Sequence, residues 1–83
     1  MKIRLRLFAT LQIYLPPGTS LSETIVDLPE SATIPDALAV LAVPMNLPHI
    51  VFVNGRHVLR PALATHQLKD GDILAAFPAI GGG

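Results

Sequence analysis

The sequence predicts an α+β domain in which a single helix packs across one mixed β-sheet. Three observations lead to this prediction. The chain has 83 residues, which is enough for one domain but not for two. Its apolar residues follow the periods of strands and of one helix, and the elements come in the order strand, strand, helix and three further strands. Because one helix covers only one face of a sheet, we expect the other face to be left to solvent or to a partner.

The first two elements are predicted to form an antiparallel hairpin. In the stretch KIRLRLFAT the aliphatic side chains of Ile3, Leu5 and Leu7 alternate with basic ones, as in a strand with one buried face. The stretch ETIVDLPE is a second short strand. Two prolines and a glycine at 16–18 mark a turn in the connection between them, which we expect to be short.

The stretch SATIPDALAVLAVP is predicted to form one helix, because it contains residues typical of helix ends. Thr33 is expected to be its N-cap, and Asp36 completes a capping box three residues later. Pro35 lies in the first turn, where the missing N–H costs little. The apolar residues that follow share one face at helical spacing, and Pro44 is expected to end the helix.

The second half of the chain is predicted to form three strands. The run Ile50–Val53 is uniformly apolar, which favours a strand covered on both sides or nearly so. Asn54 and Gly55 accept the positive φ angles of a tight hairpin turn, and residues 57–60 are the returning strand. PALATHQ is predicted to be irregular, KDGD to be a second turn, and residues 72–77 to be the last strand.

Composition and charge exclude several classes of protein. Six basic and six acidic residues give a net charge of zero without a basic stripe, so nucleic acid is not an expected partner. Without cysteine, the chain has no disulfide, thiolate metal site or cysteine nucleophile. No apolar run is long enough to cross a membrane or to act as a signal peptide. We therefore expect a soluble, cytoplasmic protein.

The chain has an excess of apolar residues for its size. Hydrophobic residues make up 51% of the sequence, and the mean hydropathy is +0.52. A small domain has proportionally more surface to cover, so some of these residues should be exposed. We expect an apolar docking patch on the sheet face opposite the helix, with Phe8 and Phe77 as candidates. As single residues, Phe8, Phe52 and Phe77 are expected to belong mainly to the core.

The polar residues do not form a recognisable catalytic or metal-binding set. Arg56 and Arg60 flank a hairpin and are expected to be solvated. Asp70 and Asp72 flank a glycine, which favours turn residues over a catalytic carboxylate pair. The histidines lack the spacing of metal ligands and are expected on the surface or in turns: His49, His57 and His66.

The end of the chain is its most unusual stretch, because FPAI leads directly into three glycines. Glycine buries no side chain and loses the most entropy on ordering, so these residues contribute little to packing. Either they are a frayed end or a remnant of expression, or the terminal carboxylate is the functional group.

The stretches VFVNGRHV and LKDGDILAAFPAIGGG together resemble the MoaD/ThiS family of ubiquitin-like sulphur carriers. The family pattern has a strand ending in Val-Asn-Gly, a later Leu-x-Asp-Gly-Asp, and a final strand leading through Phe-Pro into Gly-Gly. The chain matches at Val53–Gly55, at Leu68 and Asp70–Asp72, at Phe77–Pro78 and at Gly82–Gly83. The resemblance covers essentially the whole chain. It implies a β-grasp fold over residues 1–78 and a flexible C-terminal tail at residues 79–83.

The resemblance also implies a carrier protein rather than an enzyme. An ATP-dependent adenylating enzyme of the ubiquitin-activating type would activate the carboxylate of Gly83, and sulphur would then replace the adenylate to leave a thiocarboxylate. No catalytic residue in the folded body, no metal and no bound cofactor are expected, because ATP is used by the activating partner.

Two further groups of residues are implied as sites. The first would thread into a partner's active site: Ala79, Ile80, Gly81 and Gly82. The second would dock on the partner's surface: Phe8, Phe77 and Pro78.

The pathway and the use of the terminus have alternatives. LKDGDILAAFP favours molybdenum or tungsten cofactor synthesis, with the molybdopterin synthase large subunit as the sulphur acceptor. Sulphur transfer for thiamin, cysteine or tRNA is an alternative. So is a ubiquitin-like protein modifier, in which a lysine amine attacks the activated terminus. A third alternative is a non-covalent binding module that does not use the tail. Neither nucleic acid nor a membrane is an expected partner.

Overall fold

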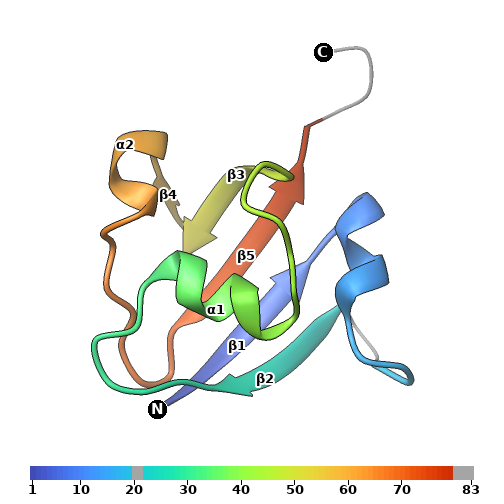
Figure 1. The fold of residues 1–83 in the computed structure, drawn as a ribbon, viewed down its shortest axis with the longest axis horizontal. Helices are drawn as coiled ribbons and strands as arrows, with labels where there is room; N and C mark the ends of the chain where they lie inside the picture. The colour runs from blue at the N-terminus through green and yellow to red at the C-terminus, as the bar shows by residue number, and fades with distance from the viewer. Residues whose placement is uncertain (20–21, 80–83) are drawn as a thin grey trace.

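A computed structural model describes residues 1–19 and 22–79 of the chain. Five strands form one sheet with the order β2-β1-β5-β3-β4, and α1 packs across it (Figure 1). The strands are β1 (Lys2–Leu7), β2 (Glu23–Asp27), β3 (Pro48–Val53), β4 (Arg56–Val58) and β5 (Ile73–Pro78). The helices are the 3₁₀-helix η1 (Ala9–Tyr14), α1 (Ile34–Val40) and the single turn α2 (Arg60–Leu63). The predicted mixed sheet with one helix across it is confirmed, and the fold is the β-grasp of ubiquitin-like proteins.

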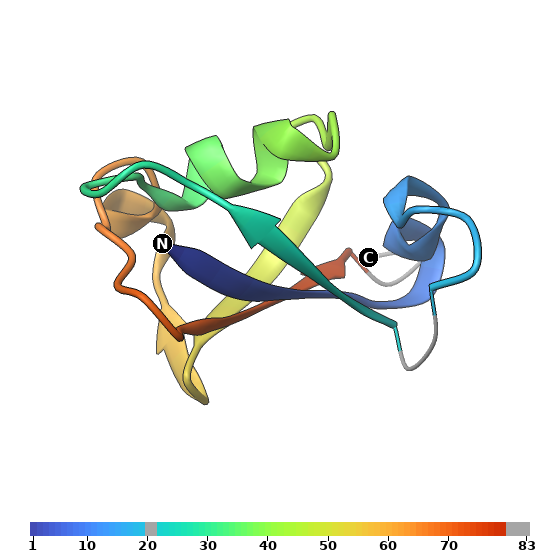
Figure 2. The ribbon, with the colours of Figure 1, turned by 90° about the horizontal axis from the view of Figure 1, so that it is seen from below.

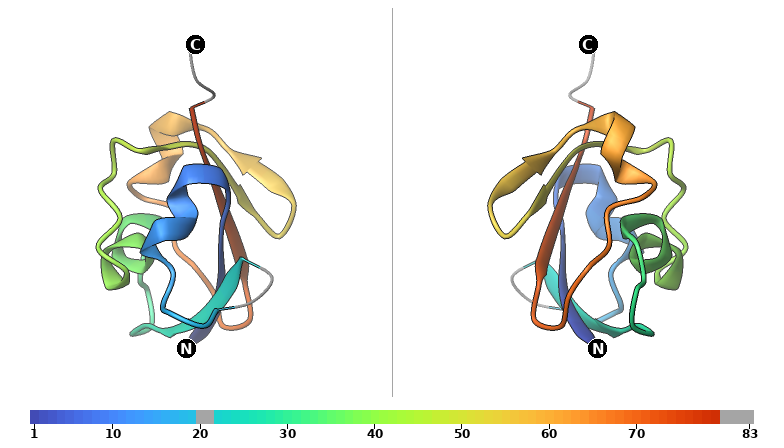
Figure 3. Two further views of the ribbon diagram at one scale, coloured as in Figure 1. Left: turned by 90° about the vertical axis from the view of Figure 1, so that its right-hand side faces the viewer. Right: turned by 90° about the vertical axis from the view of Figure 1, so that its left-hand side faces the viewer.

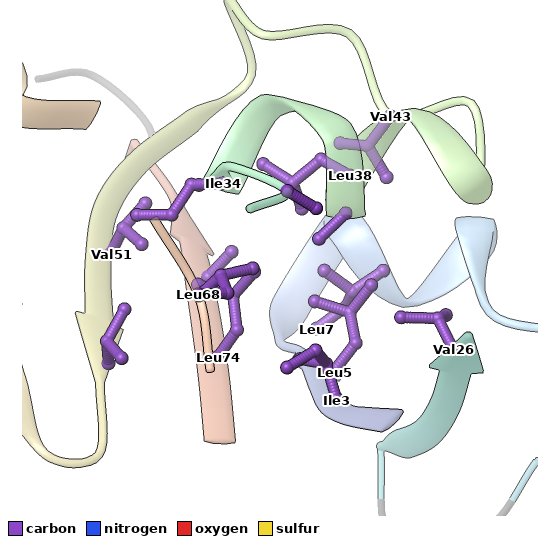
Figure 4. Close-up of a cluster of buried hydrophobic side chains, with 14 of the residues drawn as sticks. Ile3, Leu5, Leu7, Val26, Ile34, Leu38, Val43, Val51, Leu68 and Leu74 are labelled. Atoms are coloured by element: carbon purple, nitrogen blue, oxygen red, sulfur yellow. The ribbon is translucent and has the colours of Figure 1, made fainter. Parts of the chain in front are cut away.

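The hydrophobic core lies between α1 and one face of the sheet. Figure 2 shows α1 on one side of the strands only, and Figure 4 shows the side chains that fill the space between them. Ile3, Leu5 and Leu7 of β1 are fully buried, as their alternation with basic residues predicts. Leu38 of α1 and Leu74 of β5 are also fully buried. Burial of each such side chain contributes roughly 1.5–3 kcal/mol to folding.

The two central strands, β1 and β5, are parallel, whereas the other strand pairs are antiparallel. In this register Arg4 lies beside Ile73 and Leu7 beside Ala76. The C-terminal ends of β1 and β5 therefore lie at the same end of the sheet. The chain segment after β1 is thus placed next to the point where β5 ends.

The predicted antiparallel pairing of β1 with β2 is confirmed, but the expectation of a short connection is wrong. The connection spans residues 8–22 and contains η1. Ala9 has a φ angle of 52°, which turns the chain sharply after β1. Leu11 of η1 is 1% exposed. The longer connection is therefore used to close one end of the core with an apolar side chain.

Strand β3 is covered on one face only, which corrects the expectation that it is covered on both. Val51 and Val53 are buried, whereas Ile50 is 36% exposed and Phe52 is half-buried. The single helix covers only the Val51 side. The four consecutive apolar residues alternate between the core and an outer face that is also apolar. A uniformly apolar run looks the same whether the second face is buried or exposed.

The hairpin after β3 is tighter than predicted, and helix α2 follows it. Asn54 and Gly55 have φ angles of 52° and 81°, as a two-residue turn between antiparallel strands requires. The returning strand β4 covers Arg56–Val58 rather than residues 57–60, and the stretch predicted to be irregular begins with α2. Leu63 is 5% exposed, so this turn of helix adds a side chain to the core.

Helix α1 begins as predicted. The backbone N–H of Thr33 donates to Asp36 Oδ2 at 2.9 Å, and the Thr33 hydroxyl lies 3.1 Å from the same oxygen. Asp36 thus satisfies an N–H group that the first turn of the helix leaves without a partner. Its negative charge also lies at the positive end of the helix dipole.

The helix ends at Val40, four residues before the predicted stop at Pro44. Ala42 adopts a φ angle of 59°, and its N–H donates to the Ala39 carbonyl at 3.0 Å. The N–H of Val43 donates to the Leu38 carbonyl, also at 3.0 Å. This pair of bonds is the Schellman motif, which usually has glycine at the left-handed position. Val43 and Leu38 are both in the core, so burial of Val43 stabilises the early end of the helix.

Replacement of the left-handed alanine should stabilise the fold. Ala42→Gly relieves the steric cost of a positive φ angle, which exceeds the extra backbone entropy of glycine by about 0.5–1 kcal/mol. Thermal unfolding should show a midpoint a few degrees higher. The matched control is Ala39→Gly, an exposed position inside α1, where the same substitution should destabilise by about 1 kcal/mol. Destabilisation by both changes would contradict the role assigned to Ala42.

Candidate functional site

The end of β5 is the structural root of the C-terminal tail. Pro78, the last residue of β5, lies opposite Pro48, the first residue of β3. Ala79 follows and is exposed. The other expected tail residues lie outside the described residues: Ile80, Gly81, Gly82 and Gly83.

Three phenylalanines meet on the sheet face that α1 leaves open. The rings of Phe8 and Phe77 are stacked, with centroids 4.5 Å apart and planes 6° from parallel. Phe52 meets Phe77 edge-on at 5.9 Å and 87°. These are favourable aromatic geometries. The parallel pairing of β1 with β5 brings Phe8, just after β1, beside Phe77, near the end of β5.

All three rings are half-buried, so the expectation that they belong mainly to the core is wrong. Each phenylalanine is next in sequence to a buried residue: Phe8 follows Leu7, Phe52 follows Val51, and Phe77 follows Ala76. Because side chains alternate across a strand, the rings point away from α1. Ile50 pairs with Phe77 and extends the apolar area on the same face. We call Phe8, Ile50, Phe52 and Phe77 the aromatic patch.

Phe8, Phe77 and Pro78, the residues singled out for docking, are thus brought together beside the tail root. Sequence reasoning missed Phe52 and Ile50 as surface residues. The signal that could have found them is their place in β3, where they alternate with the buried Val51 and Val53. Because all four residues from Ile50 to Val53 are apolar, hydropathy alone does not tell the buried face of the strand from its exposed face.

Beyond the aromatic patch, the open face carries three ion pairs around the exposed side chain of Ile25. Lys2 pairs with Asp27 at 3.0 Å, near the start of β1. Arg4 and Arg6 share the carboxylate of Glu23 at 3.7 and 3.6 Å. These distances are longer than those of charge-assisted hydrogen bonds. The face is therefore divided into an apolar part beside the tail root and a charged part beyond it.

The two turns that carry the Val-Asn-Gly and Asp-Gly-Asp stretches are linked to each other. Asn54 Nδ2 donates to Asp72 Oδ1 at 2.8 Å, and the backbone N–H of Ile73 donates to Asn54 Oδ1, also at 2.8 Å. Asp72 Oδ2 accepts from the Lys69 N–H, and Asp70 Oδ1 from the Lys2 N–H. Both aspartates act as turn residues, as predicted.

Neither a metal-binding cluster nor a membrane-spanning helix is found among the described residues. Within residues 1–19 and 22–79, no group of three or more histidine, aspartate or glutamate side chains is placed to hold a metal ion. Across the same residues, no helix has both the length and the apolar character needed to cross a membrane.

Comparison with known proteins gives one family and several structural relatives. The ThiS family model matches residues 5–83. The solution structure of the HVO 2177 protein of Haloferax volcanii is 28% identical, with a TM-score of 0.74 over 100% of this chain and 87% of that one. The crystal structure of SAMP1 from the same organism is 25% identical, with a TM-score of 0.70 over 100% of both chains.

A third relative supports the fold. A putative molybdopterin converting factor subunit 1 from Pyrococcus furiosus is 24% identical, with a TM-score of 0.67 over 95% of this chain and 98% of that one. Among curated proteins, no sequence matches this chain.

The side-chain hydrogen bonds of Asn54 that link the two turns should contribute measurably to the free energy of unfolding. Asn54→Gly removes both side-chain hydrogen bonds but accepts the positive φ angle, and should lower the free energy of unfolding by about 1–2 kcal/mol. Asn54→Ala removes the same bonds and adds the strain of a positive φ, for about 1 kcal/mol more. Chemical denaturation of the two variants checks the order. Equal stability of both would show that the φ angle of Asn54 is not a constraint.

Proposed function

The chain belongs to the ThiS family, within the MoaD/ThiS group of ubiquitin-like proteins, and on this premise we propose that it carries sulphur on its C-terminal carboxylate. The observation that supports the proposal is that the family match reaches the last residue and includes the terminal glycines. The body then serves as the part that a partner recognises. Gly83 is the residue that reacts.

The proposed chemistry has two steps: the first uses a carboxylate oxygen of Gly83 as the nucleophile, and the second takes place at its carbonyl carbon. The carboxylate attacks the α-phosphate of ATP on an adenylating partner, which releases pyrophosphate and leaves an acyl-adenylate. A hydrosulphide equivalent then attacks the carbonyl carbon, and the C–O bond to AMP breaks. The product is a thiocarboxylate. ATP is bound by the partner, so the carrier itself needs no cofactor.

Glycine suits this chemistry for steric reasons. A side chain next to the reacting carbonyl would crowd its approach to ATP, and glycine has none. Five residues after Pro78 span up to roughly 16 Å when extended at about 3.3 Å each. This length allows the terminus to enter a buried site while the body stays outside. We propose that Ala79, Ile80, Gly81 and Gly82 thread in this way.

We propose that the aromatic patch, together with Pro78, is the surface that docks on the partner. Phe8 and Phe77 expose part of their rings beside the point where the chain leaves β5. Large aromatic side chains in a contiguous patch supply most of the energy of many interfaces. A partner that covered the patch would hold the tail root next to its own entrance.

The proposed pathway is molybdenum or tungsten cofactor synthesis, with the molybdopterin synthase large subunit as the acceptor. The stretch LKDGDILAAFP supports this choice by its likeness to the molybdopterin-synthase type. Ala79 stands where that type commonly has a second proline, and the loop after Phe8 lacks its Arg-Glu pair. Sulphur transfer for thiamin, cysteine or tRNA is therefore the alternative outcome when the acceptor is identified.

The proposed carrier function is tested by intact mass. The chain is incubated with its adenylating enzyme, ATP and a sulphur donor, beside a chain that lacks Gly83. We expect a gain equal to the exchange of one oxygen for sulphur in the full-length chain only. Absence of the gain with an enzyme that is competent on its own substrate would contradict the proposal. Isopeptide conjugates on host proteins would instead identify a protein modifier.

The docking role of the aromatic patch is tested by Phe77→Ser and Phe8→Ser. Each should weaken binding to the adenylating enzyme by at least about tenfold, because each removes an aromatic anchor. Ile25→Ser is the matched control, since Ile25 is 59% exposed on β2, outside the patch. Binding is measured by titration, and thermal unfolding confirms that each variant is folded. Equal weakening by Ile25→Ser would show that the patch has no special role.

A further inference from the structure

The sheet ends at the tail root with a pair of prolines. Pro48 and Pro78 lie opposite each other in the β3–β5 register. Neither residue has a backbone N–H, so this pair cannot make the hydrogen bonds of an antiparallel ladder. The register also shifts between Pro48 and Ile50, which leaves His49 as the extra residue of a β-bulge. The ladder is thus interrupted next to the residue from which the tail departs.

Arg60 supplies the donor that this proline pair lacks. Its Nη2 donates to the Pro48 carbonyl at 3.0 Å. Arg60 is the first residue of α2, which lies at the same end of the molecule as the end of β5 (Figure 3). A guanidinium group is therefore held at the tail root by a contact that uses one of its five N–H donors.

The positive charge of Arg60 is not balanced within the described part of the chain. The salt bridges there involve Lys2, Arg4 and Arg6 only. Three carboxylates lie at the opposite end of the sheet: Asp27 beside Lys2, Asp70 bonded to the Lys2 N–H, and Asp72 bonded to Asn54.

None of the three remaining carboxylates forms a salt bridge with Arg60 in the described part of the chain. Glu23 is held between Arg4 and Arg6. Glu30 lies between β2 and α1, and Asp36 lies in the first turn of α1. A chain with no net charge thus presents an exposed cation at the end from which the tail departs.

We propose that Arg60 is a docking anchor that binds a carboxylate on the surface of the adenylating partner. The inference rests on the proposed carrier function. The bond to Pro48 fixes the guanidinium, so less side-chain entropy is lost when the carboxylate binds. Two apolar residues close in sequence to the bonded pair are exposed: Leu59, which precedes Arg60, at 62%, and Ile50, two residues after Pro48, at 36%. Arginine is enriched among the residues that contribute most to binding at protein interfaces.

The anchor is tested by charge reversal at two arginines. Arg60→Glu should lower the association rate and the affinity for the adenylating enzyme by about tenfold at low salt, and the difference should shrink as the salt approaches about 1 M. Arg56→Glu is the matched control. Arg56 is also exposed and makes the same change of charge, but it lies beside the Asn54–Gly55 turn, at the other end of β3. It should change binding by less than about twofold.

Two conservative variants separate docking from a purely structural role. Arg60→Lys keeps the charge and should retain most of the affinity. Arg60→Gln keeps a donor for Pro48 but loses the charge, and should lose most of the salt-dependent binding. A structural role alone would give losses in thermal stability that match the losses in affinity, without dependence on salt. That result would overturn the anchor.

The same titrations distinguish failure of the anchor from failure of the carrier function. Equal binding by Arg60→Glu and Arg56→Glu, with a normal mass gain in both, would overturn the anchor alone. Wild-type binding without any mass gain would contradict the carrier function and leave the anchor supported by its own salt dependence. A wild-type chain that does not bind the enzyme would overturn both.

Discussion

The parallel pairing of β1 with β5 is the interaction on which the rest of the molecule depends. It joins the first and the last strands at the centre of the sheet, so the other strands can only add to its two sides. It buries Leu5 and Leu74 under α1. It also places Phe8 beside Phe77. A non-local contact of this kind closes a loop of nearly the whole chain, which costs entropy before the contact forms and slows folding.

The second constraint is that one helix covers one face. The outer face is therefore left without a covering helix, and its side chains differ from one part to another. Charged pairs lie over β1 and β2, and aromatic rings lie over the end of β5 and over β3. Exposure of these apolar rings to water is unfavourable in a monomer, and a contiguous patch of them is typical of an interaction site. Their position beside the tail root connects the surface that a partner could recognise with the terminus on which it would act.

Local signals in the sequence predicted the elements that depend on neighbouring residues. The Asn54–Gly55 turn is set by adjacent residues and the Thr33–Asp36 capping pair by residues three positions apart. The early end of α1 was not predictable in this way, because an alanine rarely adopts the left-handed conformation and Ala42 does so to bury Val43. The sequence around Arg60 likewise contains no pattern that predicts its contact with Pro48. Its importance comes from Pro48 and Pro78, which become neighbours only when the sheet has formed.

The pair of prolines at the end of the sheet makes the domain modular. Regular backbone pairing stops at Pro48 and Pro78, so the surface of the body and the chemistry that we propose for the terminus can change independently of each other. Substitutions in the body could redirect such a domain from one partner to another without altering the reaction at the glycine. A single small fold can in this way be reused by different pathways, with specificity residing in the body and reactivity in the end of the chain.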